Sequence, residues 1–168
     1  MLNLEGIKGV IFDLDGTLVE SALDFTAMRK IIGCPQEEDI LTFIDNLPDS
    51  EQQKAAHQVI LDHELADARD ARWLENGKAM VEAVQNANLP MAIVTRNCRQ
   101  ATDIKIANNN IPITNVLTRE CAPAKPDPTA LLMIAEQWQL VPAQCLYVGD
   151  YIYDQLAAEN AGMRWVLV

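Results

Sequence analysis

Four short apolar runs constrain the fold of this chain more than any other feature of its sequence. The first, residues 8–13 (KGVIFD), is too short for a helix and ends in a carboxylate, which is typical of a buried strand. Similar runs cover residues 91–95 (MAIVT), 145–149 (CLYVG) and 164–168 (RWVLV), and a weaker one covers residues 113–118 (ITNVLT). Such near-continuous apolar strands predict a sheet that is covered on both faces.

Helical patterns separate these runs. Apolar residues recur at helical spacing from Met80 to Ala87 and from Leu131 to Trp138. Asp127 followed by Pro128 predicts the N-cap and the first position of the second of these helices. A third helix is expected over residues 100–108. Strands that alternate with helices indicate an α/β fold, with a doubly wound parallel sheet of the Rossmann-like kind and right-handed crossovers.

Residues 19–72 interrupt this alternation, because they contain no convincing strand. We expect a helix around residues 24–32, a second on the apolar stripe from Ile40 to Leu47, and a third from Ser50 to Asp70 that begins with a capping box of Ser50 and Gln53. The sequence therefore predicts a small all-helical cap, residues 19–72, inserted after the first strand of a core formed by residues 1–18 and 73–168.

Composition and charge restrict the partners of the chain. Its 168 residues, 49% of them apolar, suffice for one core and a small insert. The net charge of −11 argues against a nucleic-acid partner, which needs clustered Lys and Arg. No apolar run approaches the roughly 20 residues of a membrane span, and the first residues do not resemble a signal peptide. Since the four cysteines are scattered and form no CxxC pair, we expect reduced thiols and a cytoplasmic protein.

Polar side chains follow the predicted strands at the points where they end. In a parallel sheet these ends share one edge, where ligands bind. The residues are four carboxylates, one hydroxyl and one ammonium: Asp13 and Asp15 in DLDGT, Thr95 in VTRN, Lys125 in AKPDP, and Asp150 and Asp154 in GDYIYD. Each alone has a structural explanation, such as a helix cap, but their coincidence on one edge indicates a functional site.

This set of side chains fits phosphoryl transfer. A carboxylate can attack phosphorus and form an aspartyl-phosphate, and a second carboxylate two residues along can protonate the leaving oxygen. Because nucleophile and phosphate are both anionic, a cation is needed, and carboxylates are suitable ligands for Mg²⁺. A Lys and a hydroxyl can neutralise and orient the remaining phosphoryl oxygens. Gly16 permits a sharp turn beside the site.

Four segments carry a resemblance to a known family. DLDGTLVES, VTRN, KPDP and GDYIYDQLAAENAGM resemble, in order, the four motifs of the haloacid dehalogenase superfamily, in particular its phosphoglycolate-phosphatase-like members with a helical cap. The resemblance implies Mg²⁺ as cofactor and the following roles: Asp13 as nucleophile, Asp15 as general acid/base, Thr95 as phosphoryl ligand, Lys125 steadying nucleophile and phosphate, Asp150 binding Mg²⁺ with Asp13 and the carbonyl of Asp15, and Asp154 on the metal side or behind it.

The sequence also departs from the family pattern. Arg96 lies between the hydroxyl of Thr95 and Asn97, and either Arg96 or Asn97 could meet the substrate phosphate. Tyr151 stands where a small hydroxyl residue is common and could narrow the site. The chain ends in a predicted strand, where relatives usually continue into another helix, so we expect one face of the sheet to be exposed there.

The leading hypothesis is Mg²⁺-dependent hydrolysis of a small phosphorylated metabolite. A phosphomutase of the same superfamily would use the same motifs but would need a cap that retains a bisphosphate, and the sequence does not distinguish the two. A different class, a non-catalytic phospho-acceptor or binding module, is disfavoured by the DLDGT spacing and the helical insert. The identity of the substrate and the oligomeric state stay open at this point.

Overall fold

The computed structural model describes residues 1–168 and contains one five-stranded sheet in which every pair of neighbouring strands is parallel. The strands lie in the order β3-β2-β1-β4-β5. Their bounds are Gly9–Phe12 (β1), Met91–Val94 (β2), Val116–Leu117 (β3), Cys145–Gly149 (β4) and Arg164–Leu167 (β5). Each apolar run of the sequence therefore contributes one strand, and the predicted doubly wound α/β fold is confirmed.

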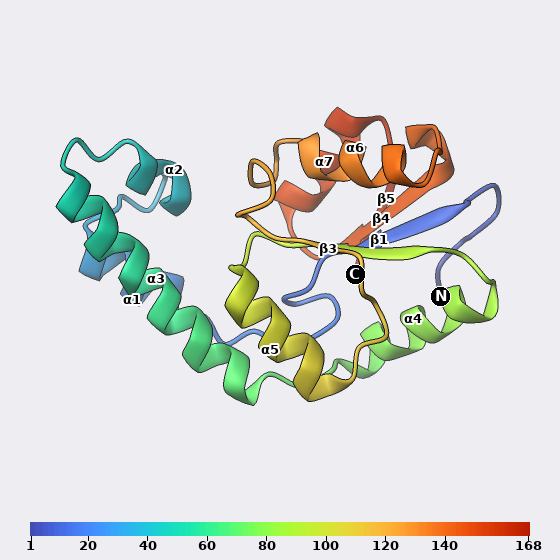
Figure 1. Ribbon diagram of the computed structural model, residues 1–168, viewed down its shortest axis with the longest axis horizontal. Helices are drawn as coiled ribbons and strands as arrows, with labels where there is room; N and C mark the ends of the chain where they lie inside the picture. The colour runs from blue at the N-terminus through green and yellow to red at the C-terminus, as the bar shows by residue number, and fades with distance from the viewer.

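Helices cover both faces of this sheet (Figure 1). On one face lie α4 (Glu75–Asn86) and α5 (Arg99–Asn109), and on the other lie α6 (Thr129–Gln137) and α7 (Ile152–Ala161). The predicted start of α6 is wrong by one residue. The helix begins at Thr129 with Pro128 as its N-cap, while Asp127, one residue earlier, still accepts from the backbone N–H of Thr129 at 2.8 Å.

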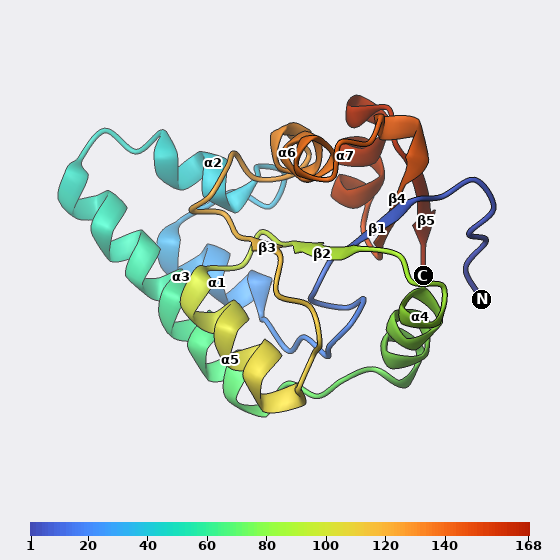
Figure 2. The same ribbon diagram turned by 45° about the vertical axis from the view of Figure 1, so that its right-hand side comes forward.

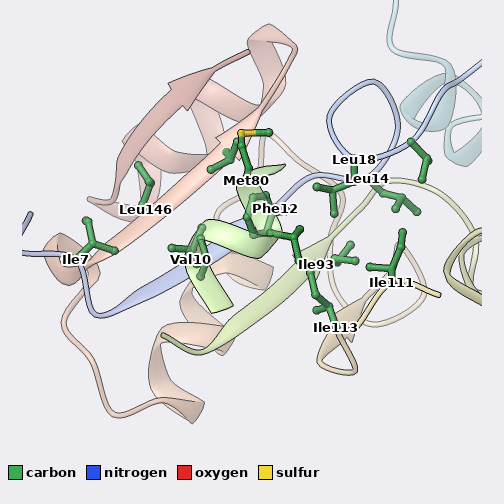
Figure 3. Packing of buried hydrophobic residues seen from close by; sticks show 14 of the residues in the cluster. Ile7, Val10, Phe12, Leu14, Leu18, Met80, Ile93, Ile111, Ile113 and Leu146 are labelled. Carbon is green, nitrogen blue, oxygen red and sulfur yellow. The ribbon is translucent and has the colours of Figure 1, made fainter. Parts of the chain in front are cut away.

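The apolar core is divided by the sheet into two layers. Val10 and Phe12 of β1 pack with Ile93 of β2 and Met80 of α4 on one face (Figure 3). Ile11 points to the other face, where it joins the cluster formed with α6 and α7. Since successive strand side chains alternate between faces, both sets must be apolar, which explains the uninterrupted apolar run of β1.

Three helices form the insert after β1, as predicted: α1 (Phe25–Ile32), α2 (Ile40–Asp45) and α3 (Ser50–Asp70). They share a small core of their own, which contains Met28, Ile44 and Ile60. The predicted capping box is wrong. Asp49 caps α3 by accepting from the backbone N–H of Glu51 at 2.9 Å, and Gln53 donates instead to the carbonyls of Asp45 and Leu47.

The insert leaves the core and returns to it at one place. Val19 forms β-bridges both with Asp15 and with Trp73. Two backbone hydrogen bonds of 2.8 Å flank this point, from Glu20 to Arg72 and from Leu74 to Leu18. Figure 2 shows α3 returning toward the core alongside α5. The chain therefore passes twice between the sheet and the insert at this point.

The last strand is only partly covered. Trp165 and Leu167 of β5, the strand at one edge of the sheet, are 40% and 37% exposed. None of the helices is both long enough and apolar enough to cross a bilayer.

Candidate active site

A cavity of about 510 Å³ opens at the carboxyl edge of the sheet, and both the core and the cap line it. All nine residues that the sequence singled out contribute to its lining: Asp13, Asp15, Gly16, Thr95, Arg96, Asn97, Lys125, Asp150 and Asp154. Asp13, Thr95 and Asp150 each directly follow a strand, β1, β2 and β4, which is why residues so distant in sequence meet here.

A buried lysine links two carboxylates at the base of the cavity. Lys125 Nζ donates to Asp13 Oδ1 at 2.8 Å and to Asp154 Oδ1 at 2.6 Å. Lys125 is only 3% exposed, so water screens neither ion pair, and the attraction between the charges is stronger than at the surface. The predicted partnership of Lys125 with Asp13 is thus present in the geometry.

The charges in this cluster set one another's protonation. Burial raises the pKa of Asp13 well above its usual value, and the Asp154 carboxylate raises it further, while Lys125 lowers it. Burial alone would lower the pKa of Lys125, but Asp13 and Asp154 outweigh burial and raise it. Lys125 therefore keeps its charge, and among the protein groups it is the one that favours ionised Asp13.

Tyr147 contacts the Lys125 cluster, and the sequence analysis missed it. It lies within β4 and is 1% exposed, and its hydroxyl accepts from Lys125 Nζ at 2.6 Å. Two acceptors lie within its reach, Asp154 Oδ1 at 3.1 Å and the Val94 carbonyl at 3.2 Å. A hydroxyl inside an apolar strand needs such partners, so the tyrosine in CLYVG was the available signal.

The second carboxylate of DLDGT has a separate set of partners. Asp15 Oδ1 lies 2.5 Å from Lys105 Nζ, and Asp15 Oδ2 accepts from Asn97 Nδ2 at 3.0 Å. Burial raises the pKa of Asp15, and Lys105 opposes this effect. A carboxyl group with a raised pKa suits a group that must donate a proton and later take one up.

Lys105 was not predicted as part of the site. It is fully buried on α5 and also donates to Asp67 Oδ2, on the cap helix α3, at 2.7 Å. It thereby joins Asp15 to the cap. Its only signal in the sequence is a cation between Ile104 and Ile106, a pattern equally typical of a solvent-exposed helix position.

Gly16 allows the loop after β1 to approach Asp150 closely. Its φ is +78°, and a Cβ at this position would lie 2.1 Å from Asp150 Oδ2. Thr17 Oγ1 in turn donates to Asp150 Oδ1 at 3.3 Å. A side chain at residue 16 would therefore displace the Asp150 carboxylate, so the predicted role of Gly16 as a sharp turn has a steric basis.

Three carboxylates are close enough to share a cation. One oxygen each from Asp13, Asp150 and Asp154 lies within 4.8 Å of the others. Asp154 Oδ2 already accepts from the backbone N–H groups of Asp150 and Tyr151, both at 3.1 Å, and its Oδ1 from Lys125. Asp13 and Asp150 each keep one oxygen that accepts no hydrogen bond from the protein. The donor set is all oxygen, which fits Mg²⁺.

The three residues that follow β2, Thr95, Arg96 and Asn97, point to different parts of the cavity. Thr95 is buried, and its Oγ1 accepts from the backbone N–H of Asn97 at 3.1 Å. Arg96 turns toward the cap, where its Nη2 lies 2.5 Å from Asp39 Oδ1. Asp39 was also missed, and nothing in the sequence distinguishes it from an ordinary helix cap. The structure thus brings Asn97 to Asp15 and Arg96 to the cap.

Comparison with known proteins agrees with this architecture. A family model described as haloacid dehalogenase-like hydrolase matches residues 10–168. A haloacid dehalogenase-like hydrolase domain-containing protein of Arabidopsis thaliana is 30% identical over 90% of this chain, which spans 66% of that protein, slightly less than two thirds. A phosphoglycolate phosphatase of Photobacterium profundum is 33% identical over 96% of this chain and 82% of its own length.

A solved structure supports the fold in the same way. The crystal structure of a hydrolase from Pseudomonas syringae matches with a TM-score of 0.76, at 23% identity, over 95% of this chain and 83% of that one. At this level of identity the match establishes the arrangement of strands and helices.

Proposed function

The chain belongs to the haloacid dehalogenase-like hydrolase family, and we propose that it hydrolyses a small phosphomonoester in a Mg²⁺-dependent reaction that passes through an aspartyl-phosphate at Asp13. The observation that carries this proposal is the buried Lys125, which contacts the Asp13 carboxylate at the base of a cavity. One oxygen of Asp13 is held by Lys125, and the other accepts no hydrogen bond, which leaves it available to attack phosphorus.

In the first step, the free oxygen of Asp13 forms a bond to phosphorus while the bond between phosphorus and the leaving-group oxygen breaks. Asp15, in its protonated form, gives its proton to that oxygen, and the alcohol leaves. The raised pKa of Asp15, caused by burial, supports this role. Thr95 Oγ1 would contact the phosphoryl oxygens, and Lys125, whose Nζ already donates to Asp13, Tyr147 and Asp154, would act on them through its positive charge.

In the second step, a water molecule attacks the phosphorus of the aspartyl-phosphate. Asp15, now ionised, takes up a proton from this water, and the bond between Asp13 and phosphorus breaks. Inorganic phosphate leaves, while Asp13 returns as a carboxylate and Asp15 as the acid.

Asp13, Asp150 and the backbone carbonyl of Asp15 would hold Mg²⁺, which supplies positive charge against the phosphoryl oxygens. Asp154 accepts from Lys125 and from the Asp150 backbone, so its contribution is to orient both.

We propose a small phosphorylated metabolite as the substrate and the cytoplasm as the location. The name of the Photobacterium profundum relative makes 2-phosphoglycolate a compound to test. The net charge of −11 supports a small molecule rather than a nucleic acid as the partner. The four cysteines are all free thiols, which supports the cytoplasm as the location.

Removal of the metal tests the function directly. We expect the purified protein to release phosphate from p-nitrophenyl phosphate in the presence of Mg²⁺. Turnover should fall to background in excess EDTA and return when Mg²⁺ is added back, because Asp13 and a phosphate repel each other without a cation. Release is measured as nitrophenolate absorbance. Undiminished turnover in EDTA would contradict the metal assignment.

Asp15→Asn tests the acid/base assignment. We expect slower turnover and an aspartyl-phosphate that persists, because an amide cannot take a proton from the attacking water. Intact-protein mass spectrometry after rapid quenching should detect one added phosphoryl group, which hydroxylamine should remove. Asp103→Asn, an exposed position on α5, is the matched control. Kinetics equal to those of the unmodified enzyme would refute the role of Asp15.

A further inference from the structure

The cap side of the cavity offers an unusual distribution of charge. Besides Lys125, three cations line the cavity, namely Arg29, Arg96 and Arg119. A substrate with a second anionic group would need one of them. Each guanidinium, however, already has partners inside the protein.

Arg96 directly follows Thr95 at the end of β2 and reaches the cap, and three groups hold its guanidinium in place. Its Nη2 lies 2.5 Å from Asp39 Oδ1, its Nη1 donates to the Lys125 carbonyl, and its guanidinium carbon lies 4.7 Å from the centre of the Tyr153 ring. Both side chains of the Arg96–Asp39 pair are less than one quarter exposed. A pair shielded to this degree is costly to separate.

The other two arginines are engaged as well. Arg119 Nη1 lies 2.6 Å from Glu64 Oε1, and Glu64 is only 3% exposed. Arg29 Nη1 donates to the carbonyl of Pro35 at 2.8 Å and to that of Glu38 at 2.5 Å, so it holds the loop between α1 and α2. Arg29 has no carboxylate partner. It is therefore the alternative cation for an anionic leaving group, and the experiment below includes it.

Much of the cap wall is apolar. Six aliphatic or aromatic side chains from the cap line the cavity, and two tyrosines face them from the core. The cap residues are Leu23, Phe25, Met28, Ile40, Leu41 and Ile60, and the core residues are Tyr151 and Tyr153. A volume of about 510 Å³ lies within the range of about 300–1,000 Å³ that is usual for sites that bind small molecules.

Taking the proposed phosphatase function as given, we propose that Asp39 is a specificity-determining residue: by occupying Arg96, it directs the enzyme to phosphomonoesters whose leaving group is uncharged and partly apolar. A leaving group with a carboxylate would have to displace Asp39 from Arg96, and Asp39 would then repel it. An uncharged leaving group avoids this conflict and gains contact with the apolar wall.

Asp39→Asn removes the charge that faces Arg96 without disturbing the fold. Asp39 is the N-cap of α2, where its Oδ2 accepts from the backbone N–H of Thr42 at 3.1 Å. Asn caps helices as well as Asp does, so α2 keeps its cap, while the negative charge opposite Arg96 disappears. Asp45→Asn, at the other end of α2 and 73% exposed, removes the same charge without touching the cavity.

The experiment compares two esters of nearly equal shape, 2-phosphoglycolate and its neutral primary amide, by kcat/KM for phosphate release. We expect the unmodified enzyme to prefer the amide. Asp39→Asn should shift the ratio toward 2-phosphoglycolate by about tenfold, the effect of one charge-assisted hydrogen bond to the freed Arg96. Asp45→Asn should leave the ratio unchanged.

Three results would overturn the inference. The first is a preference of the unmodified enzyme for 2-phosphoglycolate over its amide. The second is an Asp39→Asn protein with the same ratio of kcat/KM for the two esters as the unmodified enzyme. The third is a ratio that changes in Arg29→Met but not in Asp39→Asn. Failure of the proposed function is recognised separately, because the enzyme would then release phosphate from neither ester nor from p-nitrophenyl phosphate.

Discussion

Asp13→Asn is expected to reduce turnover by about 10⁴-fold or more, the scale on which enzymes that rely on a covalent nucleophile lose activity without it. An amide of the same shape cannot attack phosphorus under these conditions, and no other carboxylate takes its place. Asp154 is held by Lys125 and by two backbone N–H groups, and Asp15 is held by Lys105 and Asn97. Phosphate release and phosphoenzyme formation should both be absent.

The fold should survive this substitution, because Lys125 retains Asp154 and Tyr147 as partners. Circular dichroism and thermal melting of the variant should therefore resemble those of the unmodified protein. Asp103→Asn again serves as the control, since its side chain is 61% exposed. Substantial turnover by the Asp13→Asn protein would rule out Asp13 as the nucleophile.

Lys125→Met is expected to affect activity and stability together. The change keeps the unbranched side chain up to the ε position but removes the ammonium, and it leaves the carboxylates of Asp13 and Asp154 without a cation between them in a buried site. Removal of one partner from a buried ion pair costs about 3–5 kcal/mol of the free energy of unfolding. The pKa of Asp13 should rise further, because Lys125 is the group that lowers it, and less of the nucleophile would be ionised at neutral pH.

Turnover of the Lys125→Met protein should fall by about 10²- to 10³-fold, the usual effect of losing one group that stabilises phosphoryl or oxyanion charge. Denaturant titration measures the stability, and phosphate release at a temperature where the variant stays folded measures the activity. Lys54→Met, on the exposed surface of α3, should change neither. Turnover within a few-fold of the unmodified enzyme would contradict the role of Lys125.

The fold was largely predictable because its signals are local. The apolar run before Asp13 can only be a strand buried on both faces, and similar runs gave each of the five strands. In the cap, the helix over Ile40–Asp45 was likewise predictable from an apolar stripe. Errors fell at helix starts, such as Asp49 and Thr129, because several neighbouring polar residues can cap a helix and only the tertiary structure selects among them.

The candidate site was predictable only in part, for a different physical reason. Asp13, Thr95 and Asp150 stand next to strand ends, so the topology alone brings them together. Lys105 and Asp39 lie on helices or helix caps, and each acts through a partner that is 57 or more positions away in sequence. Lys105 and Asp15 meet within the core and Arg96 and Asp39 meet across the cap, and neither periodicity nor spacing records how such distant segments pack.

The double crossing at Val19 also bears on how the cap relates to the core. Because Glu20 and Arg72 are hydrogen-bonded to each other, the two ends of the insert are already joined where it leaves the sheet. For the core, the insert is therefore a closed loop, and the entropy of closing such a loop grows only slowly with its length. Residues can be added to or removed from this loop with little effect on the register of β1, so a change of cap would leave the proposed phosphoryl site of the core in place.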